Sequence, residues 1–197
     1  MNHYDPEKMR KRDVYNLMTS LVVPRPIALV SSLGPNAVIN VAPFSYFNAV
    51  SAEPPRLSIA LGHRLQSLKD TAKNILDHGA FVVNVVDEAM MEDMNKTAAP
   101  LKRHESELAQ TAFTLVDSDT TRVPGIKESK ARFECALERT VAFDDTTMII
   151  GRIQRIYVDQ SIMVDGRVDV MKLNPVGRLS GNDYALLGKR ITLKRPE

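Results

Sequence analysis

The chain has 197 residues, 44% of them hydrophobic and 25% charged, which suits one globular domain with a substantial core. The formal net charge of +2 is small, so it indicates no general attraction to nucleic acid or to anionic membranes. The single cysteine, Cys135, excludes an intrachain disulfide and a multi-thiolate metal site, and no apolar run approaches the length of a membrane span.

The N-terminal residues predict a helix from about Pro6 to Thr19. Asp5 is a good N-cap, and Pro6 suits the first helical position. Apolar residues then recur at roughly helical spacing. Pro24 and Pro26 end this pattern and start an extended segment. The same residues show no signal-peptide pattern, so we expect a cytoplasmic protein.

The stretch from Pro24 to Leu61 predicts three strands separated by different kinds of gap. The strands are the apolar runs Ile27–Leu33, Val38–Ala42 and Leu57–Leu61. The first gap contains residues typical of a turn, whereas the second, Pro43 to Asn48, combines aromatic rings with small hydrogen-bonding groups. This second gap is either a packed corner or a cradle for a flat ligand with polar edges.

A second helix is predicted from Ser67, as its N-cap, to His78, with Gly79 ending it in the left-handed conformation. Its first turn carries Lys69, Asp70 and Thr71 beside free backbone N–H groups, and Arg64 precedes it. Such a helix start is a ready anion site. The alternative is an ordinary capped amphipathic helix.

The second half of the chain is mostly predicted as strand. The expected strands are residues 80–86, 113–116, 131–143 and 147–157, with helices at 87–95 and 105–111 and a surface loop over 173–184. Alternation in the strand 131–143 places Cys135 on the buried side and Glu134 on the other. Met90, Met91 and Met94 mark one helix face, which is typical of a core or a subunit interface.

Strands outnumber helices, and hairpin turns join the later strands. The pattern therefore predicts a mainly β protein, an antiparallel barrel with peripheral α-helices. A dinucleotide-binding sheet is excluded because no G-x-G-x-x-G follows a strand. The four histidines show no metal-ligand spacing, so we predict no metal site, and no motif identifies catalytic residues.

Several ordered motifs resemble the flavin reductase family, whose fold is an FMN-binding split barrel. The resemblance covers roughly residues 20–185. It is carried by Pro24-Arg25-Pro26, Asn40-Val41-Ala42-Pro43-Phe44-Ser45, Phe47-Asn48, Ser51, Pro54-Pro55, Lys69-Asp70-Thr71, Asn74-Ile75, Phe81-Val82-Val83-Asn84-Val85, Met94-Asn95 and Pro175-Val176-Gly177-Arg178-Leu179. It implies an antiparallel Greek-key split β-barrel with peripheral α-helices, as a single domain over residues 1–197. Residues 188–197 form a basic C-terminal tail, which we interpret as solvated rather than as a nucleic-acid site.

The resemblance also implies an activity. FMN would be the cofactor, NAD(P)H would reduce it, and the electrons would pass to free flavin, a partner oxygenase or another acceptor. The family usually forms homodimers with the flavin near the subunit interface. The protein would then need only to bind, orient and tune the flavin ring, which agrees with the lack of other catalytic motifs.

The implied cofactor residues fall into three groups. Those beside the ring and ribityl chain are Ala42, Pro43, Phe44, Ser45, Asn48 and Ser51. Those at the phosphate are Arg64, Lys69 and Thr71, with Asp70 shaping the turn. Asn95 and Arg178 would reach the flavin of a partner subunit.

Three alternatives remain open from the sequence. The first is an FMN-binding electron carrier or sensor that does not turn over NAD(P)H. The second is a non-flavin relative of the same barrel, for example a heme-binding or pyridoxamine-phosphate-oxidase-like protein. For heme, His63 is the one candidate axial ligand near the predicted pocket. The third is a nucleic-acid-binding module that uses the basic C-terminus.

Overall fold

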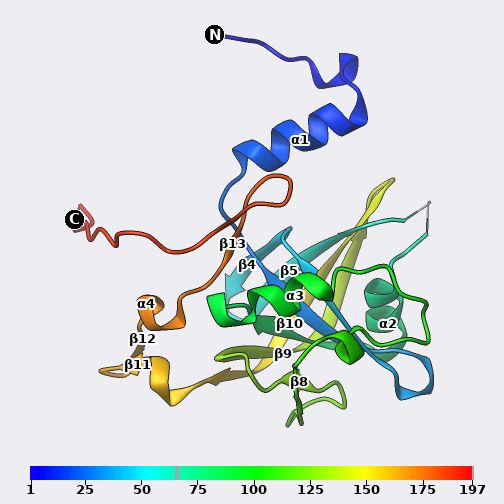
Figure 1. The fold of residues 1–197 in the computed structure, drawn as a ribbon, viewed down its shortest axis with the longest axis vertical. Coiled ribbons are helices and arrows are strands. Elements are labelled where there is room, and N and C mark those ends of the chain that lie inside the picture. Colours follow the sequence, from blue (N-terminus) through cyan, green and yellow to red (C-terminus); the bar gives the residue numbers. More distant parts are fainter. Residues whose placement is uncertain (65–66, 197) are drawn as a thin grey trace.

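A seven-stranded antiparallel sheet, in the order β3-β2-β6-β9-β10-β5-β4, forms the body of the chain (Figure 1). The computed structural model describes residues 1–64 and 67–196, so Leu65 and Gln66 of the predicted loop and Glu197 of the tail lie outside it. The strands are β1 Arg25–Pro26, β2 Ala28–Leu33, β3 Ile39–Phe44, β4 Phe47–Ala52, β5 Pro55–Gly62, β6 Ala80–Val85, β7 Leu115–Val116, β8 Gly125–Ile126, β9 Ala131–Ala142, β10 Thr146–Val158, β11 Met163–Val164, β12 Arg167–Val168, β13 Gly177–Arg178 and β14 Tyr184–Ala185.

The chain connectivity explains why this sheet closes. Strands β3 and β4 lie at opposite ends of the strand order, yet only Ser45 and Tyr46 separate them in the chain. The sheet must therefore curl until its two edges approach each other, which gives a barrel split between β3 and β4. The mainly β, antiparallel prediction is confirmed, and the nonlocal pairs β2–β6 and β10–β5 are the crossovers that a Greek-key order requires.

Two apolar clusters pack on the two faces of the sheet. The cluster inside the barrel includes Phe81, Ile59 and Ile149, all with no exposed surface. The second cluster includes Met90 and Met94, so the predicted methionine face belongs to the core. Together the two clusters form the buried core on either face of the sheet.

The helices lie at the periphery, as predicted, but the first differs from the expectation. The α-helices are α1 Lys11–Leu21, α2 Asp70–His78, α3 Met91–Lys96 and α4 Val170–Leu173, and the 3₁₀ helices are η1 Pro6–Lys8, η2 Pro35–Ala37, η3 Glu88–Met90, η4 Glu107–Gln110 and η5 Gln160–Ile162. The predicted helix from Pro6 to Thr19 is wrong as one element, because Met9 and Arg10 are extended and separate η1 from α1. The arm formed by η1 and α1 projects from the barrel (Figure 1).

No helix in the described part of the chain combines the length and the apolar composition needed to cross a bilayer.

Three further local expectations are corrected by the structure. Ser67 is not the N-cap of α2: Lys69 is, and Ser67 instead pairs with Arg64 through two backbone hydrogen bonds of 2.8 and 2.9 Å. Glu134 is 1% exposed rather than outward, because the amides of Asp119 and Thr120 donate to its carboxylate. The predicted surface loop 173–184 contains β13, which pairs with β1 in a small second sheet.

Candidate functional site

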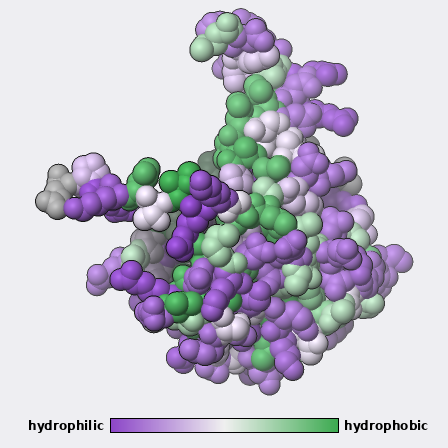
Figure 2. All heavy atoms as spheres, turned by 60° about the vertical axis from the view of Figure 1, so that its left-hand side comes forward, coloured by the Kyte–Doolittle hydropathy of each residue, from purple (hydrophilic) through white to green (hydrophobic). Residues whose placement is uncertain are grey.

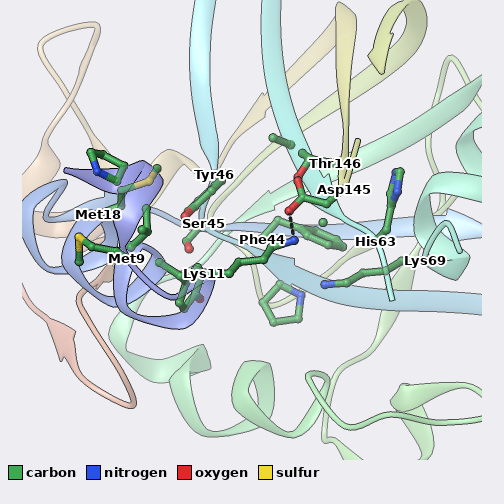
Figure 3. A pocket seen from close by; sticks show the side chains of 16 residues that line it. Met9, Lys11, Met18, Phe44, Ser45, Tyr46, His63, Lys69, Asp145 and Thr146 are labelled. Atoms are coloured by element: carbon green, nitrogen blue, oxygen red, sulfur yellow. Dashed lines mark hydrogen bonds and ion pairs between the residues drawn. The ribbon is translucent and has the colours of Figure 1, made fainter. Parts of the chain in front are cut away.

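A cleft opens where the barrel is split. One hollow, of about 830 Å³, lies between α1 and the β3–β4 connection (Figure 3). A second, of about 610 Å³, lies between that connection, the start of α2 and residues 97–101. Both are lined by Pro43, Phe44 and Lys69, so we treat them together as the seam cleft. Each has the size of a small-molecule pocket.

The start of α2 faces the second hollow without a side-chain cap. Lys69 occupies the N-cap position and makes no side-chain capping hydrogen bond, so the first backbone N–H groups of this nine-residue helix remain available. Their partial positive charge adds to that of the helix dipole. The start of α2 therefore keeps the free N–H groups on which the predicted anion site depends, although the prediction of Ser67 as its cap is wrong.

Two cations lie beside these N–H groups. Lys69 and Arg64 both line the second hollow. The ammonium of Lys69 lies 5.5 Å from the centre of the Phe44 ring, and no carboxylate in residues 1–64 or 67–196 forms an ion pair with it. Burial in the cleft lowers the pKa of Lys69, and the nearby charge of Arg64 lowers it further. An anion between them would relieve this repulsion.

The side chains of Asp70 and Thr71 are engaged within the protein. Asp70 accepts from Arg103 at 3.0 Å. Thr71 is 2% exposed and its hydroxyl donates to the side-chain oxygen of Asn40 at 2.7 Å. In this arrangement Thr71 offers a ligand its backbone N–H rather than its hydroxyl proton.

Asn40 and the buried Glu107 form a polar floor beneath the second hollow. The Asn40 amide donates to Glu107 at 2.7 Å, and the backbone N–H of Val41 on the edge strand β3 donates to the other carboxylate oxygen at 3.0 Å. Burial raises the pKa of Glu107 in spite of these hydrogen bonds. Glu107 was not predicted as a site residue, because η4 is a short element with no periodic pattern around it.

The residues predicted beside the ring form one wall of the cleft. Ala42, Pro43 and Phe44 line the second hollow, and Pro43, Phe44 and Ser45 line the first. Tyr46 and His63 also line the first hollow, and Figure 3 shows His63 on the far side of it from Met9 and Met18. The wall is thus apolar and aromatic with a few polar groups, which is the usual composition of a pocket for a flat organic ligand.

Four predicted residues lie outside the two hollows. Asn48 accepts from its own neighbour, Ala49, and Ser51 donates to the Pro54 carbonyl at 2.7 Å. Asn95 and Arg178 both contact Tyr184, Asn95 through the phenol hydroxyl at 3.2 Å and Arg178 over the ring at 4.5 Å. The pair is therefore brought together on one surface of the chain, away from Arg64 and Lys69 in the lining of the cleft.

Histidine and cysteine do not build a reactive centre here. The His63 ring nitrogen Nε2 lies 3.0 Å from the Thr147 hydroxyl. Cys135 is buried, and burial raises the pKa of its thiol, so it packs as a small apolar residue. Among the residues that the structure describes, no three His, Cys, Asp or Glu side chains are grouped to hold a metal ion.

The fold defines the class of protein, a split barrel with a cleft at its seam. A solved split-barrel domain from Shewanella frigidimarina has this fold, with a TM-score of 0.84, 22% identity and full coverage of both chains. The family model described as "Flavin reductase like domain" matches residues 18–169. The chain therefore belongs to the flavin reductase-like family.

Two solved structures are similar over nearly the whole chain. One is nitrilotriacetate monooxygenase component B from Bacillus cereus, with 37% identity, a TM-score of 0.94 and 98% of each chain covered. The other is the 2-nitrobenzoate 2-nitroreductase NbaA from Pseudomonas fluorescens, with 35% identity and a TM-score of 0.90, covering 99% of this chain and 96% of that one. Membership of the family makes this chain a flavin-related oxidoreductase.

Proposed function

We propose that the chain binds FMN in the seam cleft. The phosphate would lie at the start of α2, held by backbone N–H groups, Lys69 and Arg64. The ring would lie along Ala42–Ser45. The observation that carries this proposal is the uncapped helix start with two cations in the same hollow as Phe44.

The donor set suits this ligand at both ends. A phosphate dianion matches a helix N-terminus flanked by an ammonium and a forked guanidinium. An isoalloxazine matches the apolar face of Pro43 and Phe44, beside which Ser45 supplies a hydroxyl. Asn48, Ser51 and Thr71 remain weaker candidates, because their side chains form hydrogen bonds to other protein groups.

We further propose that NAD(P)H reduces the bound flavin and that the electrons pass to free flavin, a partner oxygenase or another acceptor. The flavin supplies the hydride and electron chemistry, and the protein binds and orients it. The similarity to a monooxygenase component B supports the partner-oxygenase outcome. The first hollow is open and about 830 Å³ in volume, which leaves room in it for the exchanging molecule beside the flavin ring.

A homodimer belongs to the same proposal. The arm carries exposed apolar side chains, among them Tyr15 at 58%, Met18 at 50% and Leu21 at 72%. A second copy would cover such a surface. Asn95 and Arg178, which meet at Tyr184 outside the cleft, could then approach the flavin of the partner subunit.

Direct reduction of a bound aromatic compound is the second candidate. It is favoured by the similarity to a 2-nitrobenzoate nitroreductase together with the first hollow, whose wall includes Met9, Met18 and Tyr46. Thioethers and phenol rings suit a planar aromatic ligand.

An absorption experiment separates these functions. The purified protein is mixed with FMN, passed through a desalting column and scanned, after which NADH or NADPH is added without oxygen. Bound flavin that bleaches supports the reductase, and faster reoxidation by a nitroarene than by free flavin supports the second candidate. Bound flavin that stays oxidised indicates a carrier or sensor. A protein that retains no flavin, or that shows a Soret band with heme, refutes the proposal.

A further inference from the structure

The wall of the first hollow contributed by α1 is attached to the barrel at few points. Val14, Tyr15 and Met18 line the hollow from α1, but Thr19 is the one residue of this helix that is buried. Figure 2 shows the arm rising from the body of the protein above an apolar base. Within one copy of the chain, the position of this wall therefore depends on specific contacts rather than on a broad packed face.

One of these contacts is exposed and the other is buried. Lys11 crosses the mouth of the hollow to pair with Asp145 at 2.5 Å (Figure 3), but both side chains are well exposed, at 84% and 55%. An ion pair of this kind contributes little. The buried contact lies at the other end of α1, where the helix meets Arg25.

Arg25 is 7% exposed and none of the described carboxylates forms an ion pair with it. Its Nη1 donates to the carbonyls of Thr19 at 2.7 Å and Val22 at 2.6 Å, which belong to the last turn and the C-cap of α1. Its Nη2 donates to the Leu179 carbonyl at 2.7 Å. The cation thus meets the negative end of the helix dipole and satisfies carbonyls that the helix itself leaves unpaired.

The same guanidinium reaches the seam. Its Nε lies 3.5 Å from the hydroxyl of Ser45, in the connection between β3 and β4. Its backbone is held by pairing with Arg178 in β13. Arg25 therefore joins the arm, the segment around Leu179 and the wall of the cleft.

We propose that Arg25 is a positioning residue that holds α1 as the outer wall of the ring-binding part of the seam cleft. It acts through Thr19, Val22 and Ser45 and does not touch the phosphate. This inference rests on the proposed flavin site. Lysine cannot replace it, because one ammonium cannot present the planar fork that reaches carbonyls from two segments at once.

The test compares Arg25→Lys and Arg25→Met with the wild type. Arg56→Met is the matched control, because Arg56 is a partly buried barrel arginine that pairs with Glu138 and not with the arm. The first measurement is limited trypsin digestion of the flavin-free protein, followed by mass spectrometry of cleavage after Lys11 and Arg12. The second is the dissociation constant of FMN and of riboflavin, which lacks the phosphate.

We expect both Arg25 variants to be cleaved in α1 at least several-fold faster than the control. We also expect FMN and riboflavin to bind about ten-fold more weakly, by the same factor, because losing a charged hydrogen bond has about that effect. Wild-type cleavage and affinities in Arg25→Lys would overturn the inference, as would a loss confined to FMN, which would make Arg25 a phosphate contact. If Arg25→Met does not fold, Arg25→Lys decides. If the wild type binds neither flavin, the proposed function fails, while the digestion still tests the attachment of α1.

Discussion

Replacing Lys69 with methionine isolates the proposed phosphate contact. Methionine keeps an unbranched apolar stem that can lie over Phe44, where the ammonium now sits 5.5 Å from the ring centre. It removes only the charge and the donor. Because riboflavin and FMN differ by the phosphate alone, the ratio of their dissociation constants reports this end of the ligand separately from the ring.

The expected magnitude follows from the exposure of the site. A hydrogen bond to a charged group contributes about 1.5–3 kcal/mol. Lys69 and Arg64 line a cleft that is open to solvent and are only partly screened from water, so the lower end of that range applies. Lys69→Met should therefore weaken FMN binding about ten-fold and leave riboflavin binding unchanged. The double variant with Arg64→Met should lose about 100-fold if the two contributions add.

Fluorescence titration of each flavin gives both constants. Lys96→Met is the control, because it removes the same charge from an exposed lysine that pairs with Asp93 on α3. If the double variant binds FMN as the wild type does, the phosphate does not lie at Lys69 and Arg64. If riboflavin loses as much affinity as FMN, the lysine acts on the ring or on the fold and not on the phosphate.

Three further predictions concern pH and packing. Because its pKa is lowered, Lys69 loses its charge at a lower pH than an ordinary lysine, so FMN affinity should fall as the pH rises through that pKa. Riboflavin affinity should show no such fall. Lys69→Arg should abolish the fall for FMN. The pKa of Glu107 is raised above 4.5, so the folded state binds more protons at this carboxyl than the unfolded state does. Stability should therefore fall as the pH rises from 4.5 through the raised pKa. Denaturation of Glu107→Gln should show a flatter pH dependence, and an unchanged slope would contradict the effect of burial. A Cβ at Gly151 would lie 2.4 Å from Cζ of the buried Phe81, so Gly151→Ala should lower the free energy of unfolding by about 1–3 kcal/mol, whereas Gly188→Ala, with open space around it, should not.

Interactions between near neighbours in the chain were predictable from the sequence. Gly79 ends α2 with a φ of 69°, as its lack of a side chain allows, and β9 and β10 meet in the expected hairpin. The antiparallel barrel, its peripheral helices and the position of Lys69 at a helix start also followed from local pattern and from the family resemblance. These features depend on backbone preferences and periodicity, which a short window of residues contains.

What the sequence left open depends on groups far apart in the chain. Glu134 is buried because amides 14 and 15 residues away donate to it, and Glu107 lies beneath the cleft because it caps an edge strand 66 residues away. Arg25 reaches a carbonyl 154 residues away. The hollow beside α1 exists because closure of the barrel brings Ser45 and Tyr46 opposite the arm. A buried charge is stable only where distant partners satisfy it, so the packed structure alone decided which polar residues lie inside and which of them form the site.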